Sequence, residues 1–243
     1  MKRRAILLGH VDGDLHTNAD LNKMYDFLCS NRGGAWCDTE IIRQANIPRL
    51  ELDRLLYEIR EEELDFTLFY FSGHGEYVRG TSLELNPSGD EINERELACL
   101  GVRQINIFDC CRKLPEKPLM KNANFGSLEG VCEAYDRKRL LCRQLYNNRI
   151  MSASPQQMSL YACSIDEYAH DFSNGGIYTN YLLSAAKSLN GDYVLASSAH
   201  AKASVLTAAE ALLRGVEQTP DYYMAKLPSR LQLVLAVNDG IVK

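Results

Sequence analysis

The sequence predicts a three-layer α/β/α sandwich around a mainly parallel central sheet of about six strands. Short apolar runs alternate along the chain with segments whose apolar residues recur at helical spacing. This alternation is typical of parallel strands with helices on both faces. The chain has 243 residues, 46% of them hydrophobic, which is enough for one large core. We therefore expect a single domain over residues 1–243.

The first part of the chain predicts strands and helices in alternation. Apolar runs of strand length predict strands at 5–9, 66–71 and 104–108. Apolar residues at helical spacing predict helices at 21–28, 52–59 and 94–100. Parallel strands need such crossover helices between them.

The segment 112–148 differs from the rest, because Lys, Arg, Asn and Glu dominate it and prolines stand near its start. We interpret it as a loop-rich connection between two halves of one sheet, residues 1–111 and 149–243. The later half predicts further strands at 149–153, 160–163 and 231–237, and helices at 177–188 and 198–213.

Composition and charge argue against several functional classes. The net charge of −5 does not favour nucleic-acid binding, which needs clustered cations. No apolar stretch is long enough to span a membrane, and the first apolar run is too short for a signal peptide. We therefore expect a cytoplasmic protein, in which the eight cysteines are reduced thiols. No C-x-x-C pair is present, so we expect no metal site.

Two motifs follow predicted strands directly. Residues 72–75 read SGHG and residues 108–113 read FDCCRK. Because the carboxyl ends of parallel strands meet at one edge of a sheet, we expect His74 and Cys111 to lie close together. A thiol beside an imidazole can act as a nucleophile with a proton-transfer partner. Gly75 allows a close backbone approach, and its N–H and that of Cys111 are candidates for an oxyanion hole.

These motifs resemble those of the caspase-like cysteine peptidases. A strand ending in SGHG and a second ending in Asp-x-Cys are similar to the metacaspase and paracaspase branch, and FDCCRK is most similar to paracaspases. NADLNKMYDFL, YACSIDE, GGIYTNYLL and QTPDY follow the family order. The resemblance covers nearly the whole chain. It implies a caspase-like fold with a large-subunit-like half (1–111), an intersubunit linker (112–148) and a small-subunit-like half (149–243).

The resemblance also implies roles for individual residues. Cys111 corresponds to the nucleophile and His74 to its partner. Cys110 falls on a variable position, where we interpret it as a packed neighbour. Asp109 occupies the position at which metacaspases and paracaspases, which cleave after Arg or Lys, carry an Asp. A buried guanidinium does require carboxylates within reach.

Further carboxylates are expected in this substrate pocket. Asp20 in the first predicted helix aligns with the second acid of the family pocket. The third acid is either Asp166 or Glu167, and we leave this choice open, with a slight preference for Glu167. The expected substrates are proteins or peptides with Arg or Lys before the scissile bond.

Linkers of this family are often cut during maturation. Several basic residues near the end of this linker are candidate autoprocessing sites, and solvated helix charges are an equally good interpretation of them: Arg137, Lys138, Arg139, Arg143 and Arg149.

The resemblance leaves other properties open. Several metacaspases depend on calcium, but we find no acidic cluster for it. Asp12-Gly13-Asp14 is interpreted as a turn, and we expect no cofactor. The remaining histidines are interpreted as structural: His10, His16, His170 and His200.

The resemblance indicates the partners and the pathway only in general terms. Small caspase-like proteins of this layout resemble bacterial ones, some of which serve in antiviral defence or cell death. Control would come from an activating partner, from processing, or from dimerisation through residues 231–237, so a monomer and a homodimer both stay open.

Two alternatives remain beside a caspase-like peptidase. One is a catalytically silent caspase-like scaffold. The other is a gingipain-like, clostripain-like or separase-like peptidase of the same clan.

Overall fold

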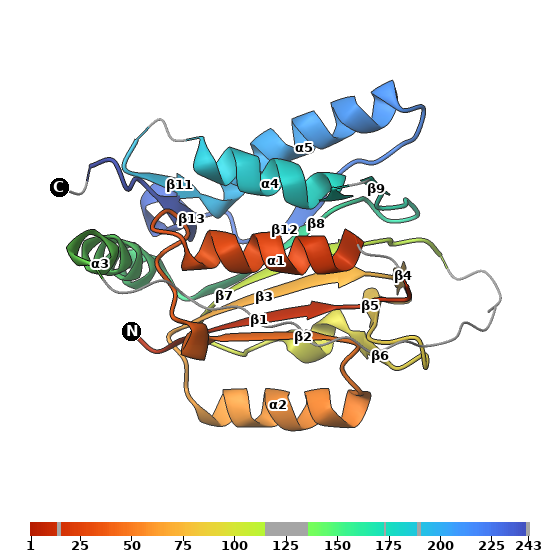
Figure 1. The fold of residues 1–243 in the computed structure, drawn as a ribbon, viewed down its shortest axis with the longest axis horizontal. Coiled ribbons are helices and arrows are strands. Elements are labelled where there is room, and N and C mark those ends of the chain that lie inside the picture. The colour runs from red at the N-terminus through yellow and green to blue at the C-terminus, as the bar shows by residue number, and fades with distance from the viewer. Residues whose placement is uncertain (14–15, 115–135, 173, 189–190, 242–243) are drawn as a thin grey trace.

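The structure is a computed structural model that describes residues 1–13, 16–114, 136–172, 174–188 and 191–241. A six-stranded sheet forms its middle layer, with the strand order β12-β8-β7-β3-β1-β2. Helices α1, α3, α4 and α5 cover one face of the sheet and α2 covers the other (Figure 1). The predicted three-layer α/β/α sandwich with a mainly parallel sheet is therefore confirmed.

Five strands of the main sheet run parallel and one edge strand runs antiparallel. The parallel strands are β1 (Arg3–Gly9), β2 (Ile41–Ala45), β3 (Phe66–Gly73), β7 (Arg103–Cys110) and β8 (Gln156–Tyr161). The edge strand β12 (Asp221–Tyr223) pairs antiparallel with β8. The sheet thus contains strands that precede the 112–148 segment in the sequence and strands that follow it.

The remaining elements surround this sheet. The helices are α1 (His16–Cys29), α2 (Arg49–Glu61), α3 (Arg137–Ser152), α4 (Ile177–Lys187) and α5 (Ala196–Leu213). Three small sheets consist of β4 (Gly75–Tyr77), β5 (Thr81–Glu84) and β6 (Glu91–Asn93); β9 (Asp171–Phe172) and β10 (Gly175–Gly176); and β11 (Tyr193–Leu195) and β13 (Val234–Val237).

The central strands are buried on both faces, as expected for a parallel sheet covered by helices. In β1, Leu7 points into the core under α1, α3 and α4, and its neighbour Leu8 points into the core over α2. In β3, Leu68 likewise points into the core under α1, α3 and α4, and Phe69 points into the core over α2. This double burial explains why these strands read as continuous apolar runs.

The strand predicted at 149–153 is wrong, because most of this run ends helix α3. The helix begins after Asp136, whose side chain accepts a hydrogen bond from the Arg139 N–H at 2.7 Å, a typical N-cap. Tyr146 and Ile150 lie one turn apart and are both buried. The helical spacing of these two residues therefore decides the conformation of the short apolar run.

The strand predicted at 231–237 forms as β13, but it does not join the main sheet. Within residues 231–237, β13 pairs antiparallel with β11 in a separate sheet, and its four residues are buried. The sixth strand of the main sheet is β12, and β2 was not predicted because only its first two residues are strongly apolar. The helix expected at 94–100 is a 3-10 turn, Glu94–Leu97.

The part of the chain that the structure describes contains no helix that is both long and apolar enough to cross a membrane.

An ion-pair network ties α3 to the first strand. Arg3 on β1 is buried, and its guanidinium lies 3.2 Å from Glu40, which also pairs with Arg143 on α3. Burial alone would raise the pKa of Glu40, but the hydrogen bonds from Arg143 and the charge of Arg3 outweigh it and lower this pKa to about 2. The network joins the end of the linker to the other half of the sheet.

Substitution Glu40→Gln should therefore lower the free energy of unfolding at pH 7 by about 3 kcal/mol, because it leaves the buried Arg3 and the half-buried Arg143 without their counter-charge. The pKa of Glu40 is lower in the folded than in the unfolded chain, so its contribution is full above about pH 5 and is lost as pH falls toward 2. Urea unfolding at pH 7 and pH 3 measures both effects. The exposed residue Glu58 supplies the control Glu58→Gln, and equal stabilities of the two variants at pH 7 would contradict this account.

Candidate active site

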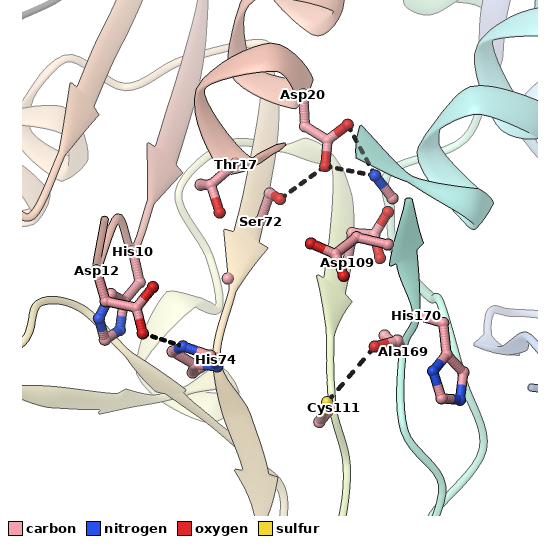
Figure 2. A pocket seen from close by; sticks show the side chains of 13 residues that line it. His10, Asp12, Thr17, Asp20, Ser72, His74, Asp109, Cys111, Ala169 and His170 are labelled. Carbon is pink, nitrogen blue, oxygen red and sulfur yellow. Dashed lines mark hydrogen bonds and ion pairs between the residues drawn. The ribbon is translucent and has the colours of Figure 1, made fainter. Parts of the chain in front are cut away.

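The register of two neighbouring strands places the candidate dyad. Strands β3 and β7 pair in parallel, with Gly73 opposite Cys110. His74 and Cys111 directly follow these two residues, and they therefore lie about one strand spacing apart. Both side chains line one cavity of about 150 Å³ at the carboxyl edge of the sheet (Figure 2). The structure thus brings together the two residues that the sequence motifs singled out.

The surroundings of Cys111 favour the protonated form of its thiol. Its Sγ donates to the backbone oxygen of Ala169 at 3.7 Å. Burial raises the pKa of the Cys111 thiol, and the nearby charge of Asp109 raises it further. A base must therefore remove the thiol proton before the sulfur can act as a nucleophile.

The His74 imidazole is oriented by a carboxylate. Its Nε2 lies 2.9 Å from Oδ2 of Asp12, in the loop after β1. Because a carboxylate accepts, the imidazole donates the Nε2 proton, which leaves Nδ1 as its acceptor nitrogen. The sequence interpretation of Asp12 as a turn residue missed this contact, since nothing in the local sequence connects residue 12 with residue 74. Asp14 lies outside the described residues.

His10 is the second residue that was missed at this end of the cavity. It was interpreted as structural, but it lines the cavity, and its ring meets the His74 ring edge-on with centroids 4.7 Å apart. The donor atoms of His10, Asp12 and His74 lie within 4.8 Å of one another. Imidazole and carboxylate are suitable ligands for zinc.

Two buried carboxylates form the other end of the cavity, as Figure 2 shows. Asp20 on α1 is 2% exposed and Asp109 on β7 is 6% exposed. Asp20 accepts from the Ser72 hydroxyl at 3.0 Å and from the Gly176 N–H at 2.9 Å. Asp109 accepts from the N–H and hydroxyl of Thr179 at 3.0 and 2.6 Å. Both carboxylates thus bind the first turn of α4, where the helix dipole favours negative charge.

The Gly175-Gly176 pair permits this close approach. A Cβ at Gly175 would come within 2.0 Å of Asp20 Oδ1, and one at Gly176 within 2.3 Å of Asp109 Oδ2. Gly175 also has a φ of +86°, which favours glycine. The glycines of the GGIYTNYLL motif are therefore required, because a side chain at either position would clash with one of the two acids.

The two acids share a site that disfavours their negative charge. Burial raises the pKa of Asp20 to about 7, and the charge of Asp109 adds to this shift. Burial also raises the pKa of Asp109 to about 6 against the opposing hydrogen bonds from Thr179. Among the described residues that line the cavity, none is Lys or Arg. The cavity therefore contains a carboxylate pair that a cationic ligand would stabilise.

Besides Asp12, Asp20 and Asp109, the cavity is lined by Asp171, which the sequence did not single out. Neither expected candidate lines the cavity. The Asp166 carboxylate pairs with Lys113 at 3.0 Å, and Glu167 accepts from the backbone N–H groups of Ser164 and Thr219 at 3.2 and 2.6 Å. The acid that follows YAC in this cavity is therefore residue 171 and not residue 166 or 167.

Gly75 lies against the segment that contains Cys110 and Cys111. A Cβ there would come 2.8 Å from Cys110 Sγ and 2.9 Å from the Cys111 oxygen, so a larger residue would push the two segments apart. Cys110 is 1% exposed and belongs to the core on the α2 side, which confirms it as a packed neighbour. The cysteines that the structure describes are free thiols.

The remaining histidines differ in their surroundings. His170 lines the cavity opposite His10 (Figure 2), so its interpretation as structural was incomplete. His200 is buried and lies 2.7 Å from the Tyr178 hydroxyl, and burial lowers the pKa of His200 to about 4. His16 begins α1.

The candidate processing residues at the end of the linker lie on helix α3: Arg137, Lys138, Arg139, Arg143 and Arg149. Arg139 is buried and donates to the Trp36 oxygen at 2.6 Å. A helical backbone does not fit a peptidase site, which binds an extended chain.

Comparison with known proteins agrees with this geometry. The family model described as "Caspase domain" matches residues 2–232. Among solved structures, protein GSU0716 from Geobacter sulfurreducens has a TM-score of 0.58 and 16% sequence identity, and the match covers 97% of this chain and 100% of that chain. An identity this low shows the shared fold alone. No curated protein matches the sequence significantly. The family model spans nearly the whole chain, and the protein therefore belongs to the caspase domain family of cysteine peptidases.

Proposed function

We propose that the protein is a cysteine endopeptidase that cleaves peptide bonds on the carboxyl side of Arg or Lys, with Cys111 as the nucleophile and His74 as its proton-transfer partner. One observation carries the proposal: the buried Asp20 and Asp109 carboxylates lie in the same cavity as the Cys111 thiol. A substrate that places a cation between these acids presents its next peptide bond toward the dyad.

The chemistry of the cavity favours a basic side chain. Two buried carboxylates repel each other, and a cation or a proton placed between them relieves that repulsion. A guanidinium can donate to both at once because its N–H groups form a planar fork. The exposed Asp171 adds a further carboxylate to the lining of the cavity. A substrate aspartate would add another negative charge and would be rejected.

The proposed reaction begins with proton transfer. His74 Nδ1 takes the thiol proton of Cys111 while the sulfur attacks the carbonyl carbon that follows the Arg or Lys side chain. Asp12, hydrogen-bonded to Nε2, stabilises the imidazolium that forms. The backbone N–H groups of Gly75 and Cys111 stabilise the oxyanion.

The tetrahedral intermediate then collapses. The C–N bond breaks, His74 gives its proton to the leaving amine, and a thioester on Cys111 remains. His74 next takes a proton from a water molecule that attacks the thioester. The second intermediate releases the carboxylate product and returns the proton to the sulfur.

A panel of fluorogenic peptides tests the specificity. We expect the wild-type protein to cleave peptides ending in Arg or Lys, and Cys111→Ala to abolish cleavage. Asp20→Asn should lower kcat/KM for the arginyl peptide at least tenfold, since it removes one of two charged hydrogen-bond partners. The matched control is Asp166→Asn, whose carboxylate lies outside the cavity, and it should change kcat/KM less than twofold. Preferred cleavage after Asp or apolar residues would contradict the proposal.

Binding of a basic peptide should be coupled to proton release. The raised pKa values of Asp20 and Asp109 mean that the empty pocket holds protons up to about pH 6–7. A bound guanidinium favours the ionised acids, so about one proton should leave on binding at pH 6 and almost none at pH 8. Affinity should accordingly rise between these pH values. Calorimetric titration of Cys111→Ala with a short arginyl peptide, in buffers of different ionisation enthalpy, measures both quantities; a pH-independent affinity would argue against the acid pair as the binding site.

We also propose that the protein cleaves itself, at a position outside helix α3. Because the five basic residues of 137–149 lie on α3, we expect any self-cleavage to fall outside this helix. Incubation of wild type and Cys111→Ala, followed by mass spectrometry of the fragments, tests this. Cuts in the wild type alone would support autoprocessing, and cuts within α3, or identical fragments from both proteins, would count against the restricted proposal.

A further inference from the structure

We propose that His10, Asp12 and His74 form a zinc-binding site, and that a zinc ion bound there withdraws His74 from catalysis. The binding site itself is argued from its ligands. Only its inhibitory consequence rests on the peptidase function proposed above.

The backbone brings the three ligands together. Gly9 at the end of β1 pairs with Ser72 near the end of β3, so the residues that follow leave the sheet side by side. The backbone N–H of His10 also donates to the Ser72 oxygen at 3.1 Å, which fixes the start of the loop against β3. One ligand atom from each of His10, Asp12 and His74 then lies within 4.8 Å of the others. Small side-chain rotations bring such atoms to zinc-ligand distances of about 2.0–2.2 Å from a common centre.

The ligand chemistry selects the metal. Two imidazoles and one carboxylate are a frequent protein set for zinc, which accepts a further ligand in its open position. Calcium and magnesium prefer oxygen ligands alone, so this set does not suit them. The cluster is distinct from the Asp20–Asp109 pair, which contains only carboxylates and which we assign to a substrate cation.

A second carboxylate supports His10 as a ligand. Glu84 on β5 places Oε1 at 3.8 Å from the His10 Nδ1. Zinc-bound histidines usually direct their second ring nitrogen toward a carboxylate or a carbonyl, which orients the ring and makes it a stronger ligand. Glu84 lies on the Nδ1 side of the His10 ring at ion-pair distance, while Asp12 and His74 are in contact at 2.9 Å.

Zinc at this site would stop proton transfer. The ion would take the place of the proton between His74 and Asp12, and that proton would move through solvent to Nδ1 of the same ring. The neutral imidazole would then hold zinc through Nε2 and carry its single proton on Nδ1, so it would not accept a proton from Cys111. The substrate pocket would remain open, so inhibition should lower kcat with little effect on the binding of arginyl peptides.

Zinc binding can be tested without peptidase activity. The probe is Zn²⁺ alone, in equilibrium dialysis against the full chain carrying Cys111→Ala and no histidine tag. We expect one bound ion per chain, and at least tenfold weaker binding after His10→Gln or Asp12→Asn in the same background. The matched control is His170→Gln on the opposite wall of the cavity, which should bind zinc as the parent does. Circular dichroism confirms that each variant is folded.

The outcomes separate this inference from the proposed function. Absence of binding, or equal binding by the parent and both ligand variants, would overturn the site. Binding that requires Cys111 but not His10 would place the metal on the dyad and would also overturn it. Binding as predicted in a chain that cleaves no arginyl peptide would support the site and refute the peptidase function. In an active chain, inhibition by zinc should be reversed by a chelator and weakened at least tenfold by His10→Gln, relative to that variant's own metal-free rate.

Discussion

The site depends on the hydrogen bonds that the start of helix α4 donates to Asp20 and Asp109. Backbone N–H groups of Gly176 and Thr179 hold the two carboxylates, and only glycine fits at Gly176 beside them. Two like charges are thereby kept buried in one cavity, at a cost in stability that hydrogen bonds offset only in part. Because α4 follows the linker, whereas both acids precede it, this contact also joins the two halves of the chain.

The parallel register of β1, β3 and β7 arranges everything else around that pair. His10, His74 and Cys111 each come directly after the end of one of these strands. The same edge therefore holds the proposed nucleophile, the proposed base, and the three proposed zinc ligands, of which the base is one. In our proposal the His74 imidazole therefore has two competing partners, the Cys111 thiol in catalysis and a metal ion in the inhibited state. Inhibition by a metal ion bound within the active site would need no additional regulatory domain.

The sequence alone could predict the fold class, the candidate dyad and two of the pocket acids, because these lie in or directly after elements with clear periodicity. Asp12 and Asp171 could not be found in this way, since each reaches the cavity from a loop or a short strand whose course depends on tertiary contacts. The helical conformation of residues 149–152 was missed for a related reason. A short apolar run fits a strand and a buried helix end equally well, and only the packing of Tyr146 and Ile150 distinguishes the two.

The central claim is that a buried acid pair selects a basic residue for attack by Cys111. A crystal structure of the protein after reaction with an arginyl chloromethyl ketone tests it most directly. We predict a covalent bond from the inhibitor to Cys111 Sγ, with the guanidinium donating hydrogen bonds to both Asp20 and Asp109. A guanidinium bound outside this pair, or an adduct on another thiol such as the exposed Cys99, would contradict the account.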